Sequence, residues 1–441
     1  MNEVQEPKKI LGSVAISPEV IDDVKKHAGG LEAFGKKAEE YASESTTKLL
    51  DVILFGAINL GASDIHIEPQ EEKVRLRIRL DGILQDAVFF DQTIYHNLLS
   101  RLKLLSKLKL NITEKPQDGR FTVAAEDLLI EIRTSSLPSE YGESLVMRIL
   151  NPQNLIGLES LGLRKDLYKI LEKEIKRPNG MIAVSGPTGS GKTTTLYAFL
   201  VKIQNPEIKI ITIEDPIEYH LQGISQTQVA PEKGYSFAQG LMSIVRQDPD
   251  VILVGEIRDA QTAKIALQAS LTGHLVLSTI HTNDAAGTIP RLVDLGAELP
   301  AIASAIKTII GQRLIRLACK ECAIMVSPSK EELAEIKKGL KNVSKATGTP
   351  KNLDKVKIAK VSDKGCKACG FMGYKGRKGI FEVFLVDAQM EKFILTGPSV
   401  AAIKALLMKK GMVTMYQSGL IEVALGETTL EEVKKVVEAD E

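Results

Sequence analysis

The chain has no tryptophan, and aromatic residues make up only 5% of its 441 residues. Aromatic stacking on nucleic-acid bases is therefore not an evident theme. The net charge is only +1, so no overall excess of either sign points to nucleic acid or to an acidic membrane surface. These scarcities argue against a dedicated nucleic-acid-binding protein, and we expect no specific nucleic acid among its partners.

Long apolar runs are also missing. No stretch reaches the roughly 20 residues that a membrane-spanning helix needs, and the N-terminal sequence MNEVQEPKKI lacks the apolar core of a signal peptide. We therefore predict a cytoplasmic protein that can dock on a membrane partner. Cysteine is sparse, with four residues, and a reducing compartment argues against disulfides.

The first third of the chain shows two patterns. Residues 1–45 are polar, rich in Lys and Glu, and weakly patterned, so we interpret them as an N-terminal segment or linker. Residues 49–60 then have apolar positions at helical spacing, and KVRLRIRLDG alternates apolar and basic residues as a strand does. A smaller α/β domain is predicted at 46–150.

The pattern changes in the remainder of the chain, 151–441. The short apolar runs MIAVSG, IKIITIED, VILVGEIRD and HLVLSTIH each end in polar or charged residues. Buried parallel strands with functional groups at their carboxyl ends have this pattern. The sequence therefore predicts a doubly wound α/β domain over 151–441, within which the stretch 323–365 is rich in lysine and interrupted by Gly, Pro and Ser.

A phosphate-binding motif, GPTGSGKT, occupies 186–193 and matches G-x-x-x-x-G-K-[ST]. It follows the apolar MIAVS and opens the helical TTTLYAFLVKI, a context that a chance Gly-rich turn would lack. Lys192 would reach the β- and γ-phosphates, Thr193 would hold Mg²⁺, and the helix would place its positive end at the anion. The predicted nucleotide-binding residues are Gly186, Pro187, Thr188, Gly189, Ser190, Gly191, Lys192, Thr193 and Thr194.

Carboxylates needed for hydrolysis follow two later strands. DPDVILVGEIRD places Asp250 before a strand and Glu256 just after it, where a carboxylate can hold Mg²⁺ directly or through water. TIEDPIEYH offers Glu214, Asp215 and Glu218, and we favour Glu214 as the group that orients the attacking water, with Glu218 as the alternative. Each acid alone could be a solvated loop carboxylate, but two clusters at two strand ends favour hydrolysis.

Histidines flank the last of the four apolar runs, at His274 and His281. Ser278, Thr279 and His281 could sense the γ-phosphate by hydrogen bonding, but a histidine beside an apolar strand is equally well explained as structural. We take His281 as the catalytic candidate.

Three arginines, Arg75, Arg77 and Arg79, share one face of the strand KVRLRIRL. A solvated basic face and a nucleic-acid patch are two explanations. The third is that these side chains meet ATP held by another domain, since the guanidinium fork pairs two phosphate oxygens at once. Spacing alone does not choose among the three.

All four cysteines fall into two CxxC pairs, Cys319–Cys322 and Cys366–Cys369. Four thiolates suit tetrahedral Zn²⁺, with each short turn supplying two ligands. The 43 residues between the pairs exceed the spacing of compact zinc ribbons, so the intervening segment would have to form a protruding excursion. The alternative is two redox or unrelated pairs.

Taken together, these motifs resemble those of the ATPases of type II secretion and type IV pilus assembly. SDIHIEP with RLRIRLDG, PQDGR and LPSEYGESLVMRIL resemble the domain that precedes the motor in this family. GPTGSGKTTTLY resembles its Walker A motif, TIEDPIEYH its Asp box, QDPDVILVGEIRD its Walker B motif and TGHLVLSTIHTNDA its His box. CKEC and CKAC resemble the tetracysteine zinc site of the assembly and secretion branch, and the resemblance covers about 46–441.

The resemblance implies a RecA-like ATPase domain, a smaller PAS-like α/β domain before it, and a zinc subdomain at 319–369. It also implies a homohexamer with ATP and Mg²⁺ between the two domains. Arg77 and Arg79 would reach the γ-phosphate, with Arg101 as a further candidate, and Glu256 would be the Walker B acid. Hydrolysis would drive an inner-membrane platform protein that adds or extracts pilin subunits, at the inner face of the cytoplasmic membrane.

Several alternatives stay open. A retraction, DNA-uptake or conjugation ATPase keeps the chemistry, although the retraction motors of this family lack the four cysteines. A nucleotide-gated nucleic-acid-binding module predicts salt-sensitive DNA binding, and a ring scaffold would bind ATP without turnover. Assembly ATPases usually carry a further N-terminal domain, so the 45 residues before the match indicate either a short member or a truncated chain.

Overall fold

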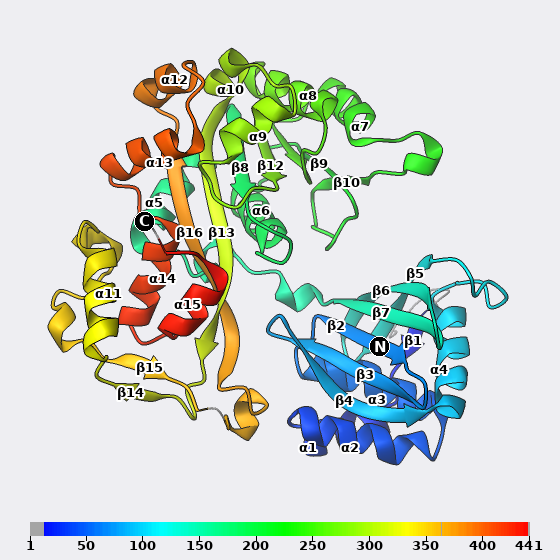
Figure 1. The fold of residues 1–441 in the computed structure, drawn as a ribbon. Coiled ribbons are helices and arrows are strands. Elements are labelled where there is room, and N and C mark those ends of the chain that lie inside the picture. The colour runs from blue at the N-terminus through cyan, green and yellow to red at the C-terminus, as the bar shows by residue number, and fades with distance from the viewer. Residues whose placement is uncertain (1–12, 363, 440–441) are drawn as a thin grey trace, which may run out of the picture. The chain divides into compact units, whose positions relative to one another are not determined.

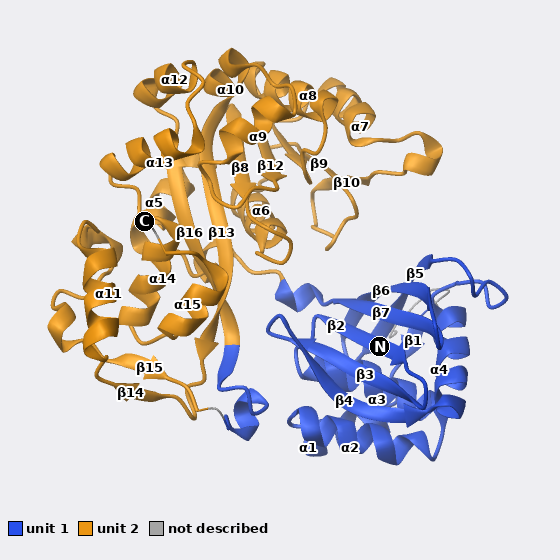
Figure 2. Cartoon of the chain, in the orientation of Figure 1, with its two compact units in different colours: residues 1–154, 363–375 blue, residues 155–362, 376–441 orange. Residues whose placement is uncertain are grey.

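The computed structural model describes residues 13–362 and 364–439 (Figure 1). The chain divides into two compact units (Figure 2): unit 1 comprises 1–154 and 363–375, and unit 2 comprises 155–362 and 376–441. Of the predicted N-terminal segment 1–45, the first twelve residues lie outside the described residues.

Within its described residues, unit 1 is built on a mixed sheet of seven strands in the order β1-β5-β6-β7-β2-β3-β4. All neighbours are antiparallel except β1 and β5, which are parallel. The strands are β1 (Ser13–Ala15), β2 (Asp64–Pro69), β3 (Lys73–Leu80), β4 (Ile83–Asp91), β5 (Gln117–Ala125), β6 (Leu128–Ser139) and β7 (Gly142–Leu150).

Strand β3 is the alternating strand that the sequence predicted. Val74, Leu76 and Ile78 are fully buried in the core of unit 1, whereas the arginines between them are partly exposed. Because side chains alternate between the two faces of a strand, this register puts all three arginines on one face.

The α-helices in the described part of unit 1 are α1 (Pro18–His27), α2 (Leu31–Ala42), α3 (Thr46–Asn59) and α4 (Gln92–Leu105). The core that contains α3 also contains Val20 and Val24 of α1 and Phe34 and Ala38 of α2, all fully buried. Residues 13–45 therefore pack into unit 1. Their pattern looked weak because the two helices are short and are separated by a Gly-Gly pair.

Unit 2 contains the second sheet of seven strands, in the order β10-β9-β11-β12-β8-β13-β16. The first six strands in this order are parallel to their neighbours, as the apolar runs predicted. The strands are β8 (Gly180–Ser185), β9 (Ile210–Glu214), β10 (Ser225–Gln228), β11 (Val251–Val254), β12 (Leu275–Ile280), β13 (Ile306–Ala318) and β16 (Tyr374–Leu385).

Helices cover both faces of this sheet. Met181 and Ala183 of β8 belong to a core formed with α7 (Phe237–Ile244), α8 (Ala260–Leu271), α9 (Thr288–Asp294), α10 (Leu299–Ala305), α12 (Ala388–Ile394) and α13 (Val400–Lys409). Ile182 and Val184 face a different core, formed with α5 (Lys165–Glu174) and α6 (Lys192–Ile203). Alternate residues of one strand thus serve opposite layers, which confirms the predicted doubly wound α/β fold.

The lysine-rich stretch between the cysteine pairs has its own elements: β14 (Ile324–Val326), α11 (Lys330–Leu340) and β15 (Ile358–Lys360). The two strands form a small antiparallel sheet. Ile336 and Ile358 pack in one core with residues of α14 (Met415–Ala424) and α15 (Leu430–Val436). Among the described residues, no helix combines the length and apolarity needed to cross a bilayer.

Candidate nucleotide-binding site

The phosphate loop connects β8 to α6, and its conformation requires glycine. Gly186, Gly189 and Gly191 have φ values of 150°, 79° and 86°, in the left-handed region that side chains disfavour. A Cβ on Gly186 would lie 2.6 Å from the carbonyl oxygen of Gln312, and one on Gly191 would lie 2.8 Å from its Nε2. The loop is therefore held closely against β13.

Lys192 is the first residue of α6 and is only 8% exposed. Its Nζ donates to the carbonyl oxygens of Gly186 (2.8 Å) and Pro187 (2.9 Å). Burial lowers the pKa of Lys192 to about 8. Within the described chain, the buried hydroxyl of Ser190 has no hydrogen-bond partner. A buried ammonium and an unpaired hydroxyl in a Gly-rich loop fit a phosphate group.

The other predicted loop residues differ in exposure. Pro187, Thr188, Gly189 and Thr193 are exposed, and Thr194 is half-buried. Thr193, the predicted Mg²⁺ ligand, lies in the first turn of α6 and is open to solvent. The loop thus presents an accessible side to a ligand while its lysine and Ser190 form the buried side.

Glu256 follows β11 and is buried, with 8% of its surface exposed. Its Oε2 lies 2.5 Å from Nε of Arg258 and 3.5 Å from Nε2 of His281. Burial lowers the pKa of His281, and the positive charges of Lys192 and Arg258 lower it further, so the imidazole is neutral near pH 7. The negative charge of Glu256 in turn partly offsets the lowered pKa of Lys192. The charges of Lys192, Glu256 and Arg258 therefore all act on the imidazole of His281.

Arg258 is a site residue that the sequence analysis missed. Its side chain is 63% exposed and lies 4.0 Å from Asp215 of the Asp box, as well as against Glu256. It therefore connects the ends of β9 and β11. The available signal was its position in GEIRD, where a single cation stands between two acids.

Glu214, the favoured water-orienting residue, is held in a buried network and is 3% exposed. Its Oε1 accepts hydrogen bonds from Thr212 Oγ1 (2.5 Å) and Gln226 Nε2 (3.2 Å), and the hydroxyl of Tyr197 donates to Oε2. In the sheet, β11 and β12 lie between β9, which carries Glu214, and β8. The backbone N–H of Glu218 donates to the Tyr197 hydroxyl (3.3 Å).

The polar residues of the His box have backbone partners. Ser278 Oγ donates to the carbonyl oxygen of Val254 (2.8 Å), and Thr279 Oγ1 donates to that of Gly255 (2.7 Å). Nδ1 of His274 lies 3.0 Å from a carbonyl oxygen at the end of α8. The hydrogens of both hydroxyls are thus used to tie β12 to the neighbouring β11, and His281 is the His-box side chain that contacts Glu256.

Two residues of β13, Gln312 and Arg313, also belong to the loop's surroundings and were not predicted. Gln312 Oε1 accepts a hydrogen bond from Thr195 of α6 (2.7 Å). Arg313 donates to the carbonyl oxygen of Asn283 (2.7 Å), and burial lowers its pKa. A sequence signal existed, because GQRLIR places polar residues inside an otherwise apolar strand.

In unit 1, the three arginines of β3 face the acids of β2. Antiparallel pairing sets Asp64 opposite Arg79 and Glu68 opposite Arg75. Arg75 (3.1 Å) and Arg77 both donate to Glu68, and Arg79 Nε lies 3.3 Å from Asp64. Arg75, Arg77 and Arg79 therefore each have a carboxylate partner within their own unit.

The arginine face of β3 also carries hydrogen-bond donors that these ion pairs do not use. The Nε–H groups of Arg75 and Arg77 are buried and have no hydrogen-bond partner among the described residues. Arg101 lies elsewhere in unit 1, exposed on α4.

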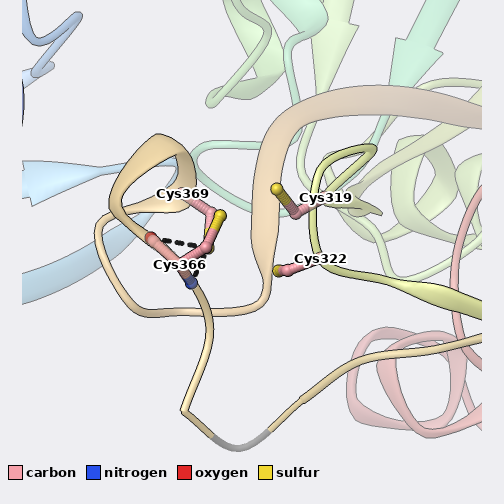
Figure 3. Close-up of side chains that lie close together, drawn as sticks. All are labelled: Cys319, Cys322, Cys366 and Cys369. Carbon is pink, nitrogen blue, oxygen red and sulfur yellow. Dashed lines mark hydrogen bonds between the residues drawn. The ribbon is translucent and has the colours of Figure 1, made fainter.

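The two CxxC pairs meet, as the zinc prediction required (Figure 3). Cys319 directly follows β13, while Cys366 and Cys369 precede β16, and these strands are neighbours in the sheet. The four Sγ atoms lie within 4.8 Å of one another, and those of Cys366 and Cys369 are 3.8 Å apart. Zinc–sulfur bonds of about 2.3 Å give tetrahedron edges of roughly 3.8 Å, so the donor set fits a tetrahedral metal ion.

The phosphate loop between β8 and α6, with an acid at the end of the parallel strand β11, defines the class of phosphate-loop nucleotide-binding proteins. The family profile described as "Type II/IV secretion system protein" matches residues 39–435. The chain belongs to this family. The resemblance to secretion and pilus-assembly ATPases that the sequence motifs predicted is thereby confirmed.

Known relatives support the same assignment. The type II secretion system protein E of Dickeya dadantii is 42% identical over 89% of this chain and 76% of its own length. The type II secretion system ATPase E of Vibrio cholerae is 41% identical over 88% of this chain and 75% of its length. The type IV pilus assembly ATPase PilB of Thermus thermophilus is 40% identical over 89% of this chain, which spans 43% of that protein.

Solved structures agree with the fold. The pilus retraction motor PilT with bound ADP matches with a TM-score of 0.58 and 26% identity, over 88% of this chain and 96% of its own. The Legionella pneumophila ATPase DotB matches with a TM-score of 0.63 over 88% of this chain and 94% of its own. At 21% identity, the DotB match supports the fold alone.

Proposed function

We propose that the chain is a motor that hydrolyses ATP to power type IV pilus assembly or the extension of a type II secretion pseudopilus. It would act as a homohexamer on an inner-membrane platform protein, at the inner face of the cytoplasmic membrane. The observation that carries the proposal is the convergence of Lys192, Glu256 and His281 at one end of the unit 2 sheet. Relatives about 40% identical are named as secretion and pilus-assembly ATPases.

In this proposal, Lys192 and the N–H groups of the phosphate loop hold the β- and γ-phosphates of ATP. Thr193 and Glu256 would hold Mg²⁺, which would supply positive charge beside the phosphates. Glu214 orients the attacking water, with Glu218 as the alternative. Neutral His281 beside Glu256 can donate a hydrogen bond without adding a positive charge to the site.

The proposal also assigns roles to the predicted domains. Unit 1, in which the predicted domain at 46–150 packs with residues 13–45, would supply Arg77 and Arg79, and the domain at 151–441 would hold the nucleotide. A hexamer offers each site an arginine from outside its own ATPase domain. Arg77 and Arg79 each use one nitrogen toward Glu68 or Asp64, and further N–H groups of each guanidinium are available to meet a phosphate.

Substitution of Glu214 by Gln tests the catalytic assignment. Glu214→Gln keeps the size of the side chain and removes its charge, so we expect unchanged ATP binding and a turnover lowered by about 100-fold or more. Phosphate release at saturating ATP measures the loss, and Glu207→Gln, at an exposed loop residue, is the matched control. Normal hydrolysis by Glu214→Gln would move the role to Glu218.

We further propose that the four cysteines hold Zn²⁺ as a structural ion, which would tie the end of β13 to the segment before β16. We expect Cys319→Ser to lose the zinc that copurifies with the wild-type chain and to unfold at a lower temperature. Elemental analysis of the purified proteins is the measurement, and Ser327→Ala, an exposed residue of the same excursion, is the control. Equal zinc content in wild type and Cys319→Ser would overturn this assignment and weaken the choice of the assembly branch over retraction.

A further inference from the structure

Tyr197 lies in α6, five residues after Lys192, and is fully buried. Its hydroxyl donates a hydrogen bond to Oε2 of Glu214 and accepts one from the backbone N–H of Glu218 (3.3 Å). One side chain of the helix that begins at the phosphate loop therefore contacts both candidate water-orienting residues.

The two oxygens of Glu214 are held by different elements. Oε1 accepts from Thr212, on β9 itself, and from Gln226 on β10. Oε2 accepts from Tyr197, which belongs to α6. A buried carboxylate is costly unless hydrogen-bond donors replace its hydration. Tyr197 is thus the contact through which the orientation of Glu214 depends on the phosphate-loop helix.

The surroundings of Tyr197 keep its hydroxyl protonated and restrict the orientation of its ring. Burial, together with the negative charge of Glu214, raises the pKa of Tyr197 far above its usual value, so the hydroxyl keeps its proton. Its ring meets that of Tyr219 edge to face, with centroids 6.2 Å apart and an interplanar angle of 72°. Edge-to-face packing restricts the ring, so the hydroxyl position follows that of the helix.

We propose that Tyr197 is a positioning residue for ATP hydrolysis, which aligns Glu214 according to the position of the phosphate-loop helix. The inference rests on the proposed role of Glu214. Lys192 and Tyr197 lie on the same short helix. A shift of α6 when the loop closes on phosphate therefore also moves the Tyr197 hydroxyl, which donates to Oε2 of Glu214. Tyr197 therefore acts through Glu214 and need not touch the nucleotide.

Substitution of Tyr197 by Phe removes the hydroxyl and keeps the ring. We expect kcat to fall by about tenfold or more, while KM and the affinity for ATP stay within about twofold. Tyr168→Phe is the matched control, because it removes a hydroxyl that donates to the exposed Glu159 (3.1 Å) in the same unit. Wild-type kcat is expected for this control.

A double-variant cycle separates positioning from a general structural effect. If Tyr197 acts through Glu214, then Tyr197→Phe should not lower kcat further in a Glu214→Gln background, measured by single-turnover hydrolysis of radiolabelled ATP. A loss of the same factor in both backgrounds would overturn the proposal. If Tyr197→Phe alone does not fold, the double variant is still informative, because it carries no buried charge that lacks a donor, and a further loss of kcat relative to Glu214→Gln would overturn the proposal.

The outcomes for the two claims are distinct. If Glu214→Gln hydrolyses ATP normally, the proposed role of Glu214 is wrong, and the inference about Tyr197 loses its basis. If Glu214→Gln loses turnover and folded Tyr197→Phe keeps the wild-type kcat, only the inference about Tyr197 is overturned.

Discussion

The arginine strand of unit 1 and the nucleotide end of the unit 2 sheet both concentrate charge, but they satisfy it differently. On β3, Arg75, Arg77 and Arg79 face carboxylates of the adjacent β2. At the end of β8, the ammonium of Lys192 is buried against carbonyl oxygens, and the hydroxyl of Ser190 has no partner among the described residues. Charge that folding leaves without a counter-ion marks where a ligand binds, whereas paired charge is already partly satisfied within the fold.

The largest expected effect concerns Lys192, the charge without a carboxylate contact. Lys192→Ala should weaken ATP binding by about 100-fold or more, because it removes a buried ammonium that no neighbour replaces. Titration with a fluorescent ATP analogue measures the affinity. Lys264→Ala, at an exposed residue of α8, is the control and should bind normally. Equal ATP affinities for Lys192→Ala and Lys264→Ala would contradict the assignment of Lys192 to phosphate binding.

A smaller loss of ATPase activity is expected when an arginine of the paired region on β3 is replaced. Arg77→Ala should leave the nucleotide affinity of an isolated subunit unchanged, yet lower the ATPase rate of the assembled protein by about tenfold or more. Glu68 keeps Arg75 as a partner in this variant, so unit 1 should remain folded. Arg120→Ala, whose side chain is 71% exposed on β5, is the control. If the assembled Arg77→Ala protein has the wild-type rate, β3 carries only cross-strand ion pairs.

The smallest effect is on the pH dependence of ATP affinity. Burial lowers the pKa of Lys192 to about 8 in the free protein, and bound phosphate favours its charged form. The affinity should therefore be flat below pH 8 and fall as the pH rises above it, by at most about tenfold per pH unit. Titrations from pH 7 to about pH 9.5 would show this slope. Lys192→Ala should lack it, and a flat wild-type profile would contradict the lowered pKa.

Local motifs predicted the parts of the site that are continuous in sequence. The phosphate loop needs glycines at particular positions of one turn, so GPTGSGKT was sufficient to find it. The alternation in KVRLRIRL likewise predicted both a strand and the common face of its arginines. The cysteine pairs predicted a metal centre, although only the excursion between β13 and β16 explains how they meet across 43 residues.

The sequence did not predict contacts between elements that lie far apart along the chain. Arg258, Gln312 and Tyr197 were missed because their partners lie on other helices, strands or loops, at sequence distances that no motif spans. Glu214 illustrates the same limit. It follows the strand next in sequence after the phosphate loop, yet β11 and β12 separate the two strands in space.

The sequence by itself thus determined the phosphate loop, the alternation of strands and helices, and the two CxxC pairs that supply four clustered thiols. These features depend on backbone conformation and hydrophobic periodicity within a few residues. Only the tertiary structure decided the strand order, and with it the carboxylate partners of the β3 arginines and the burial of Glu214. The reason is physical, because the electrostatic surroundings of a side chain depend on elements that folding brings beside it from distant parts of the chain.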